Sequence, residues 1–146
     1  MDLNYDDCVE IVLSLLQDEV DGDVTSAMSK LTRDYTMTWM YKSPRKGNLF
    51  PRAARSDEAF VRETAAIYAI KDRAYDIRHV ASANSLVMVE LVESYTDPAT
   101  KAIHRTPLVL VLEMDGNKVA RGRHYCDPNL SLLALPKGVV NAALSQ

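Results

Sequence analysis

The stretch Leu108–Asp127, LVLVLEMDGNKVARGRHYCD, is the strongest indication of the fold in this sequence. Two runs of strand-forming residues flank Asp115-Gly116-Asn117, a combination that favours a tight turn. Strands joined by a short turn run antiparallel. The stretch therefore predicts a β-hairpin, with strands over His104–Met114 and Val119–Asp127. The segment Leu108–Met114 is apolar on both faces, so we expect both of its sides to be covered.

Three more segments have strand character. Ala74–Ala81 and Leu86–Thr96 are separated by the tight turn Asn84-Ser85, and the looser turn Asp97–Thr100 follows. In Tyr35–Tyr41, YTMTWMY, aromatic and apolar residues alternate with the period of a strand. The neighbouring strands after residue 74 are expected to pair antiparallel.

Three helices are expected before the four strands that follow residue 74, and the strand Tyr35–Tyr41 comes between the second helix and the third. The first has apolar residues at the helical interval: Val9, Val12, Leu13, Leu16 and Val20. Asp23 is a suitable N-cap for the second, whose apolar face is Val24, Ala27, Met28 and Leu31. Ser56 can cap the third, whose buried stripe is Phe60, Val61, Thr64, Ile67 and Tyr68. Helices followed by a run of strands indicate an α+β fold, with the helices on one face of a curved sheet.

Composition excludes several classes of protein. The chain has 146 residues, enough for one domain over 1–146, with 47% hydrophobic and 25% charged residues. Its net charge of −3 argues against a nucleic-acid binder that follows phosphates. No apolar run is long enough to span a membrane, and the acidic N-terminus is unlike a secretory signal. Cys8 and Cys126 are far apart in the chain, so we expect reduced thiols, a cytoplasmic protein and no metal site.

The helix and strand order, together with the hairpin quoted above, resembles the nuclear-transport-factor-2-like superfamily. That group includes SnoaL-like polyketide cyclases, ketosteroid isomerases, scytalone dehydratase and limonene epoxide hydrolase. The resemblance covers nearly the whole chain. It implies a cone-shaped α+β barrel, in which three N-terminal helices pack on a curved, mostly antiparallel sheet around a pocket. It also implies a homodimer formed through the outer face of the sheet.

The segment His79–Glu93, HVASANSLVMVELVE, is similar to a stretch of limonene epoxide hydrolase. Those enzymes use an Asp–Arg–Asp set in the pocket. The resemblance puts the first Asp on Glu93, the Arg on Leu91 and the second Asp on His124. The tyrosine that helps hold the attacking water falls on Tyr41, and its asparagine partner on Ser43. Leucine cannot bridge two carboxylates, so Glu93 and His124 remain as the pair.

The chemistry of this pair follows from its surroundings. Glu93 shares a strand face with Val89, Leu91 and Tyr95, and a carboxyl group among apolar neighbours has a raised pKa. A nearby His124 would stabilise the charged carboxylate. Such a pair can take a proton from a substrate atom and return it nearby.

Further residues are expected around the pair. Tyr41 is a hydrogen-bond donor to a substrate oxygen, while Trp39, Leu91, Leu108 and Leu110 line the pocket. Core packing is the other role open to Trp39 and Tyr41. His79 has either a structural role or a substrate contact. The basic stretch 42–55 is either a lid over the pocket or a solvated loop.

We therefore predict a cofactor-free acid–base enzyme that acts on a small hydrophobic substrate, such as an aromatic, polyketide or terpenoid compound. Isomerase, dehydratase, cyclase and lyase reactions fit equally, because one fold hosts many chemistries. Sequence motifs for nucleotides, zinc proteases and serine hydrolases are absent. Epoxide hydrolysis is an alternative that needs an arginine from elsewhere, such as Arg78, Arg121 or Arg123. A non-catalytic ligand-binding or protein-interaction dimer is the other.

Overall fold

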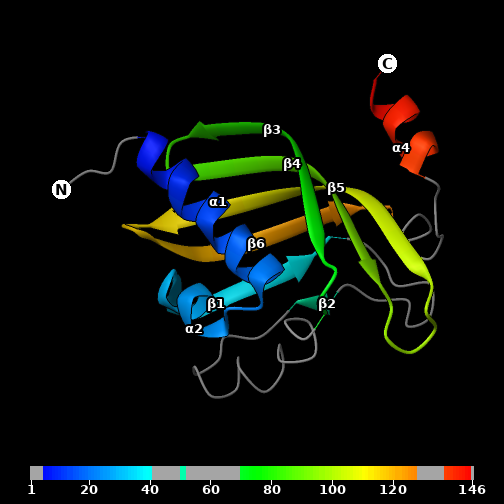
Figure 1. Ribbon diagram of the computed structural model, residues 1–146. Coiled ribbons are helices and arrows are strands. Elements are labelled where there is room, and N and C mark those ends of the chain that lie inside the picture. Colours follow the sequence, from blue (N-terminus) through cyan, green and yellow to red (C-terminus); the bar gives the residue numbers. More distant parts are fainter. Residues whose placement is uncertain (1–4, 41–49, 52–69, 128–136, 146) are drawn as a thin grey trace.

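The structure, a computed structural model, describes residues 5–40, 50–51, 70–127 and 137–145 (Figure 1). Six strands form one sheet in the order β2-β1-β6-β5-β4-β3. Neighbours pair antiparallel, except that β1 runs parallel to β6. The strands are β1 Leu31–Trp39, β2 Phe50–Pro51, β3 Ala74–Ala83, β4 Leu86–Thr96, β5 Ile103–Asp115 and β6 Lys118–Cys126.

The helices lie on the sheet. Helix α1, Tyr5–Asp21, crosses one face of it, which we call the inner face, and contacts β3 and β4 (Figure 1). Helix α2, Val24–Ser29, begins after Asp23, whose Oδ1 accepts a hydrogen bond of 2.9 Å from the Ser26 amide. Helix α4, Lys137–Leu144, contacts β5.

The core fills the space between α1 and the inner face. From the helix it takes residues at the helical interval: Cys8, Val12, Leu15 and Leu16. From the sheet it takes alternate residues, which point to one side: Val87, Val89, Leu91, Leu108, Leu110, Leu112 and Val119.

The α+β fold predicted from the sequence is confirmed. Strand β4 has the predicted bounds, and β3, β5 and β6 differ from them by one or two residues at their ends. Strand β1 begins at Leu31, which had been expected on the second helix. Phe50–Pro51 is a short strand, although the stretch 42–55 was expected to be irregular. The rest of that stretch, Tyr41 and the third helix lie outside the described residues.

Two smaller predictions can be compared with the structure. Cys8 and Cys126 are both free thiols, as expected. No helix in the described part of the chain is long and apolar enough to cross a membrane.

Candidate functional site

Glu93 lies on the inner face of β4, as the alternation predicts. The strand register places it between Tyr75 of β3 and Thr106 of β5, and cross-strand neighbours share a face. Leu91 and Leu108 form the next pair along the same face. Glu93 is thus a carboxyl group at the edge of an apolar core.

Arg73 is the partner of Glu93. Its Nη1 forms an ion pair and hydrogen bond with Glu93 Oε1, and the two side chains are only 6% and 16% exposed. Arg73 lies directly before β3, and its side chain reaches Glu93 diagonally across the β3–β4 pair. Hydrogen bonds between charged groups are stronger than neutral ones, so this contact fixes both side chains.

Helix α1 adds a second carboxyl group. Tyr75 Oη donates a hydrogen bond of 2.5 Å to Glu19 Oε2, and Arg73 Nη1 lies 3.5 Å from the Tyr75 oxygen. Glu19 follows Leu16 by three positions and Val12 by seven, which puts it on the buried side of α1. We call Glu19, Arg73, Tyr75 and Glu93 the Arg73 cluster.

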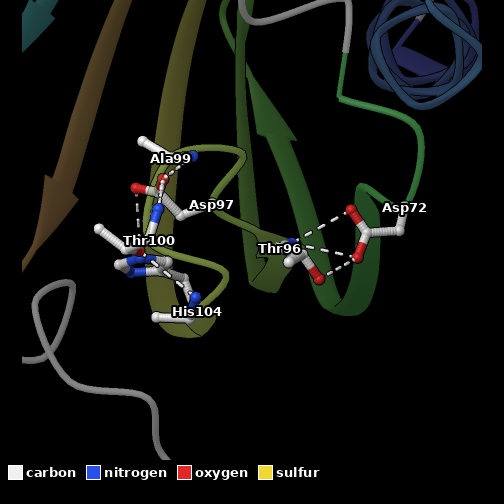
Figure 2. A network of polar contacts seen from close by, with 7 residues as sticks. Asp72, Thr96, Asp97, Ala99, Thr100 and His104 are labelled. Atoms are coloured by element: carbon white, nitrogen blue, oxygen red, sulfur yellow. Dashed lines mark hydrogen bonds and ion pairs between the residues drawn. The ribbon is translucent and has the colours of Figure 1, made fainter.

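Aromatic rings enclose the guanidinium group of Arg73. Its Cζ lies 5.2 Å from the ring centroid of Tyr95 and 6.0 Å from that of Tyr75, within reach of a cation–π interaction. Tyr95 stacks on His104 with ring centroids 5.0 Å apart. His104 Nε2 is in turn 3.9 Å from Asp97 Oδ2, at the turn between β4 and β5 (Figure 2).

Burial changes the acidity of the cluster. It raises the pKa of Glu93, and the positive charge of Arg73 only partly offsets this. It also raises the pKa of Glu19, against the hydrogen bond from Tyr75. The pKa of Tyr75 is raised well above its ordinary value, first by burial and then by the two carboxyl groups. Since Arg73 supplies one positive charge for two carboxyl groups, the cluster is neutral when one of them holds a proton.

The structure does not bring Glu93 and His124 together. Glu93 pairs with Thr106, whereas His124 pairs with Leu110, four residues further along β5. Two strand spacings and four residue steps separate the two side chains by on the order of 15 Å along the sheet. Burial lowers the pKa of His124 to about 4. The expected Glu93–His124 pair is therefore replaced by the Glu93–Arg73 pair.

His79 is on the opposite face of the sheet. A β-bulge between Ile77 and His79 shifts the register, so that His79 pairs with Glu90 rather than Leu91. The His79 side chain is 83% exposed, and its Nδ1 lies 2.7 Å from Glu90 Oε2. The bulge turns the His79 side chain away from the inner face on which Glu93 lies, and a substrate contact of His79 stays a prediction.

The remaining expected residues have different outcomes. Leu91, Leu108 and Leu110 are on the inner face and are buried in the core. The backbone of Trp39 pairs with Phe50 and His124 at the end of β1. Tyr41 lies outside the described residues, so its role as a donor stays a prediction.

The arginines named as substitutes in the sequence analysis pair elsewhere. Arg78 contacts Asp76 and Asn141, while Arg121 and Arg123 both pair with Glu113. Arg73 takes the place beside Glu93 instead. It was missed because the strand was expected to start at Ala74. Its position two residues before Tyr75 was the available signal, since such residues share a strand face.

Glu19 was missed for a different reason. The first helix was predicted from its apolar residues alone, whereas Glu19 takes the next position of the same buried stripe. Among the described residues, no group of three or more potential metal-ligating side chains is found.

Solved structures share this architecture at low sequence identity. A nuclear-transport-factor-2-like protein from Burkholderia xenovorans LB400 matches with a TM-score of 0.69 and 15% identity, over 92% of this chain and all (100%) of that chain. One from Burkholderia thailandensis E264 matches with a TM-score of 0.65 and 17% identity, over 88% of this chain and 98% of that one. The chain has the nuclear-transport-factor-2-like fold.

The nuclear-transport-factor-2-like fold is shared with enzyme candidates. A protein from Jannaschia sp. CCS1, described as a candidate SnoaL-like polyketide cyclase, matches with a TM-score of 0.71 and 14% identity, over 92% of this chain and 96% of that chain. No protein-family model and no curated protein matches the sequence. The nuclear-transport-factor-2-like fold hosts more than one chemistry, so function has to be argued from the Arg73 cluster.

Proposed function

We propose that the protein is a cofactor-free acid–base enzyme whose general base is Glu93. The observation that supports this proposal is the ion pair between Glu93 and Arg73 at the edge of the apolar core. Burying two charges costs more free energy than filling the same space with apolar side chains. Buried carboxyl groups with raised pKa values and specific charge partners are typical of functional sites.

The substrate is a small, largely hydrophobic molecule that bears an oxygen atom. Arg73 contributes a donor for that atom, because its buried Nε has no hydrogen-bond partner in the described part of the chain. Leaving a buried donor unsatisfied costs about 1–3 kcal/mol. A substrate oxygen, or a water that a substrate displaces, would satisfy it.

In the proposed reaction, the Glu93 carboxylate takes a proton from a carbon next to a carbonyl group or from a hydroxyl group. The substrate oxygen receives a proton from Tyr75, and Glu19, which holds a proton to higher pH than an exposed glutamate, replaces it. The Glu93 proton then returns to a different carbon of the resulting enol, and the enol oxygen gives its proton back to Tyr75 and Glu19, which completes an isomerisation. If Tyr75 instead protonates a hydroxyl group on the carbon adjacent to the one that loses its proton, that carbon–oxygen bond breaks and water leaves. A proton then passes from Glu93 to Glu19 through solvent, which completes a dehydration.

Epoxide hydrolysis is a second candidate, because an arginine contacts one carboxyl group, that of Glu93, and is linked through Tyr75 to a second, that of Glu19. Glu93 would take a proton from water, whose oxygen attacks one epoxide carbon. The carbon–oxygen bond breaks, and the released oxygen takes a proton that comes from Glu19. The product is a diol, and the cluster regains its protons by transfer from Glu93 to Glu19 through solvent.

Isotope labelling separates these candidates. We would incubate the protein with a panel of small terpenoid and aromatic ketones in deuterated water, and with matching epoxides in water labelled with oxygen-18. Deuterium at the carbon beside the carbonyl supports the first proposal, and a diol with one oxygen-18 supports the second. If every substrate is returned unlabelled while ligands still bind, the protein is a ligand-binding module and both proposals are wrong.

A further inference from the structure

Asp72 forms a clamp at the end of β4. Both of its carboxylate oxygens lie 3.1 Å from the backbone nitrogen of Thr96, and Oδ2 also accepts a hydrogen bond from Thr96 Oγ1 (Figure 2). Asp72 directly precedes Arg73 in the chain. Thr96 directly follows Tyr95, whose ring is under the Arg73 guanidinium group. The clamp therefore joins the two backbone segments that present Arg73 and its aromatic neighbour.

The backbone pairing of β3 and β4 stops short of this point. The last pair toward this end is Ala74 with Ser94, and the same register would place Asp72 opposite Thr96. The Asp72 side chain thus bonds the Thr96 amide where the backbone ladder has ended. Arg73 is held on one side by the ladder and on the other by the clamp.

We propose that Asp72 is a positioning residue, which holds Arg73 in contact with Glu93. This inference rests on the proposed role of Glu93 and deepens it. Arginine has many side-chain conformations, so a fixed backbone on both sides reduces the freedom that the ion pair must overcome. Without the clamp, the segment before Ala74 is free to leave the end of the sheet and the Arg73–Glu93 contact is lost for part of the time.

The proposal and a simple charge effect predict shifts of the Glu93 pKa in opposite directions when Asp72 is replaced. Asp72 carries a negative charge, and removing a negative charge near Glu93 lowers the pKa of Glu93. Losing the contact with Arg73 removes a positive charge from a buried carboxylate and raises that pKa. Asp72→Asn removes the charge but keeps an oxygen that can accept from Thr96, whereas Asp72→Ala removes both.

The experiment follows the carboxyl carbon of Glu93 by NMR in glutamate-labelled protein, with Glu93→Gln used to assign the signal. We expect Asp72→Ala to raise the pKa of Glu93 by about one unit. Asp72→Asn should leave it unchanged or slightly lower. Asp115→Ala is the matched control, because it removes an exposed carboxylate from the distant turn between β5 and β6, and it should change nothing.

An unchanged or lowered pKa of Glu93 in Asp72→Ala would overturn the proposal. Thr96→Val provides a second test if Asp72→Ala does not fold, since it removes only the hydroxyl partner of the clamp. It should raise the pKa of Glu93 in the same direction, and no rise would overturn the proposal as well. The titration needs no turnover, so failure of the enzyme proposal appears separately, as an unreactive wild-type protein whose Glu93 still responds to Asp72→Ala.

Discussion

Arg73 and Glu93 form an ion pair on the inner face of the sheet, at the edge of the apolar core. The two residues are 20 positions apart in the sequence, and the pairing of β3 with β4 brings them together. Glu19 and Tyr75 complete the cluster from α1 and β3.

Arg73→Ala should lower the free energy of unfolding by about 3–5 kcal/mol at neutral pH, because it leaves the buried Glu93 carboxylate without its partner. Urea unfolding followed by circular dichroism measures the change. Arg121→Ala is the control, since Arg121 forms an exposed ion pair with Glu113 and should cost less than about 1 kcal/mol. The double variant Arg73→Met with Glu93→Gln should recover much of the loss. A loss in Arg73→Ala no larger than in the control would contradict the buried pair.

Glu93→Gln should lower turnover of any substrate found by about 10²–10⁴-fold, as expected when a general base is removed. Glu90→Gln is the matched control on the same strand. Glu90 is on the outer face beside His79, so its loss should leave turnover unchanged. Steady-state rates of the two variants measure the effect, and circular dichroism verifies that both variants keep the fold. Full activity in Glu93→Gln would show that Glu93 is not the general base.

The raised pKa of Glu19 predicts a particular pH dependence of stability. An acid whose pKa is higher in the folded state binds its proton more tightly there. Its stabilising contribution is complete below the ordinary pKa of 4.5 and is lost as pH rises through the folded value. The stability of Glu19→Gln relative to wild type should therefore increase with pH over this range. Urea unfolding of the two proteins at a series of pH values measures this difference, and a difference that does not grow with pH would contradict the prediction.

His124 should remain neutral well below the pH at which an exposed histidine gains its proton. Burial lowers its pKa to about 4, so its contribution to stability is lost as pH falls from about 6.5 through that value. Nitrogen-15 NMR of the imidazole ring measures the titration, and His124→Asn assigns it. A pKa above the ordinary 6.5 would instead indicate a carboxylate beside the ring, as the sequence analysis had expected of Glu93.

The homodimer stays a prediction, which we localise to the outer face of the sheet. Met88 and Tyr125 are 44% and 40% exposed there, and they pair across the strands with Val111 and Val109. Sedimentation equilibrium of the wild type should give twice the chain mass. Met88→Glu should shift the protein to monomer, whereas Glu10→Gln should not. A monomeric wild type at high concentration would contradict the prediction.

The resemblance in sequence pattern led to the correct fold, and strand alternation placed Glu93 on the correct face. The order of helices and strands and the alternation along a strand are both local patterns, so they can be recognised in the sequence. The expected partner of Glu93 was wrong because strand register sets the distance between β4 and β6 residues, and a shift of four residues separates His124 from Glu93. The face of His79 differs from the one that simple alternation predicts, because a single bulge reverses the face on which a side chain lies.

Sequence order alone determined the hairpin of β5 and β6, the bounds of β4 and the mixture of helices and strands. These features depend on turn residues and on the periods of apolar side chains, which involve only near neighbours. The tertiary structure decided the parallel pairing of β1 with β6 and the meeting of Glu19, Arg73 and Glu93. Such contacts join residues far apart in the chain, and they follow from how the strands pair and how α1 packs across the sheet rather than from any local pattern.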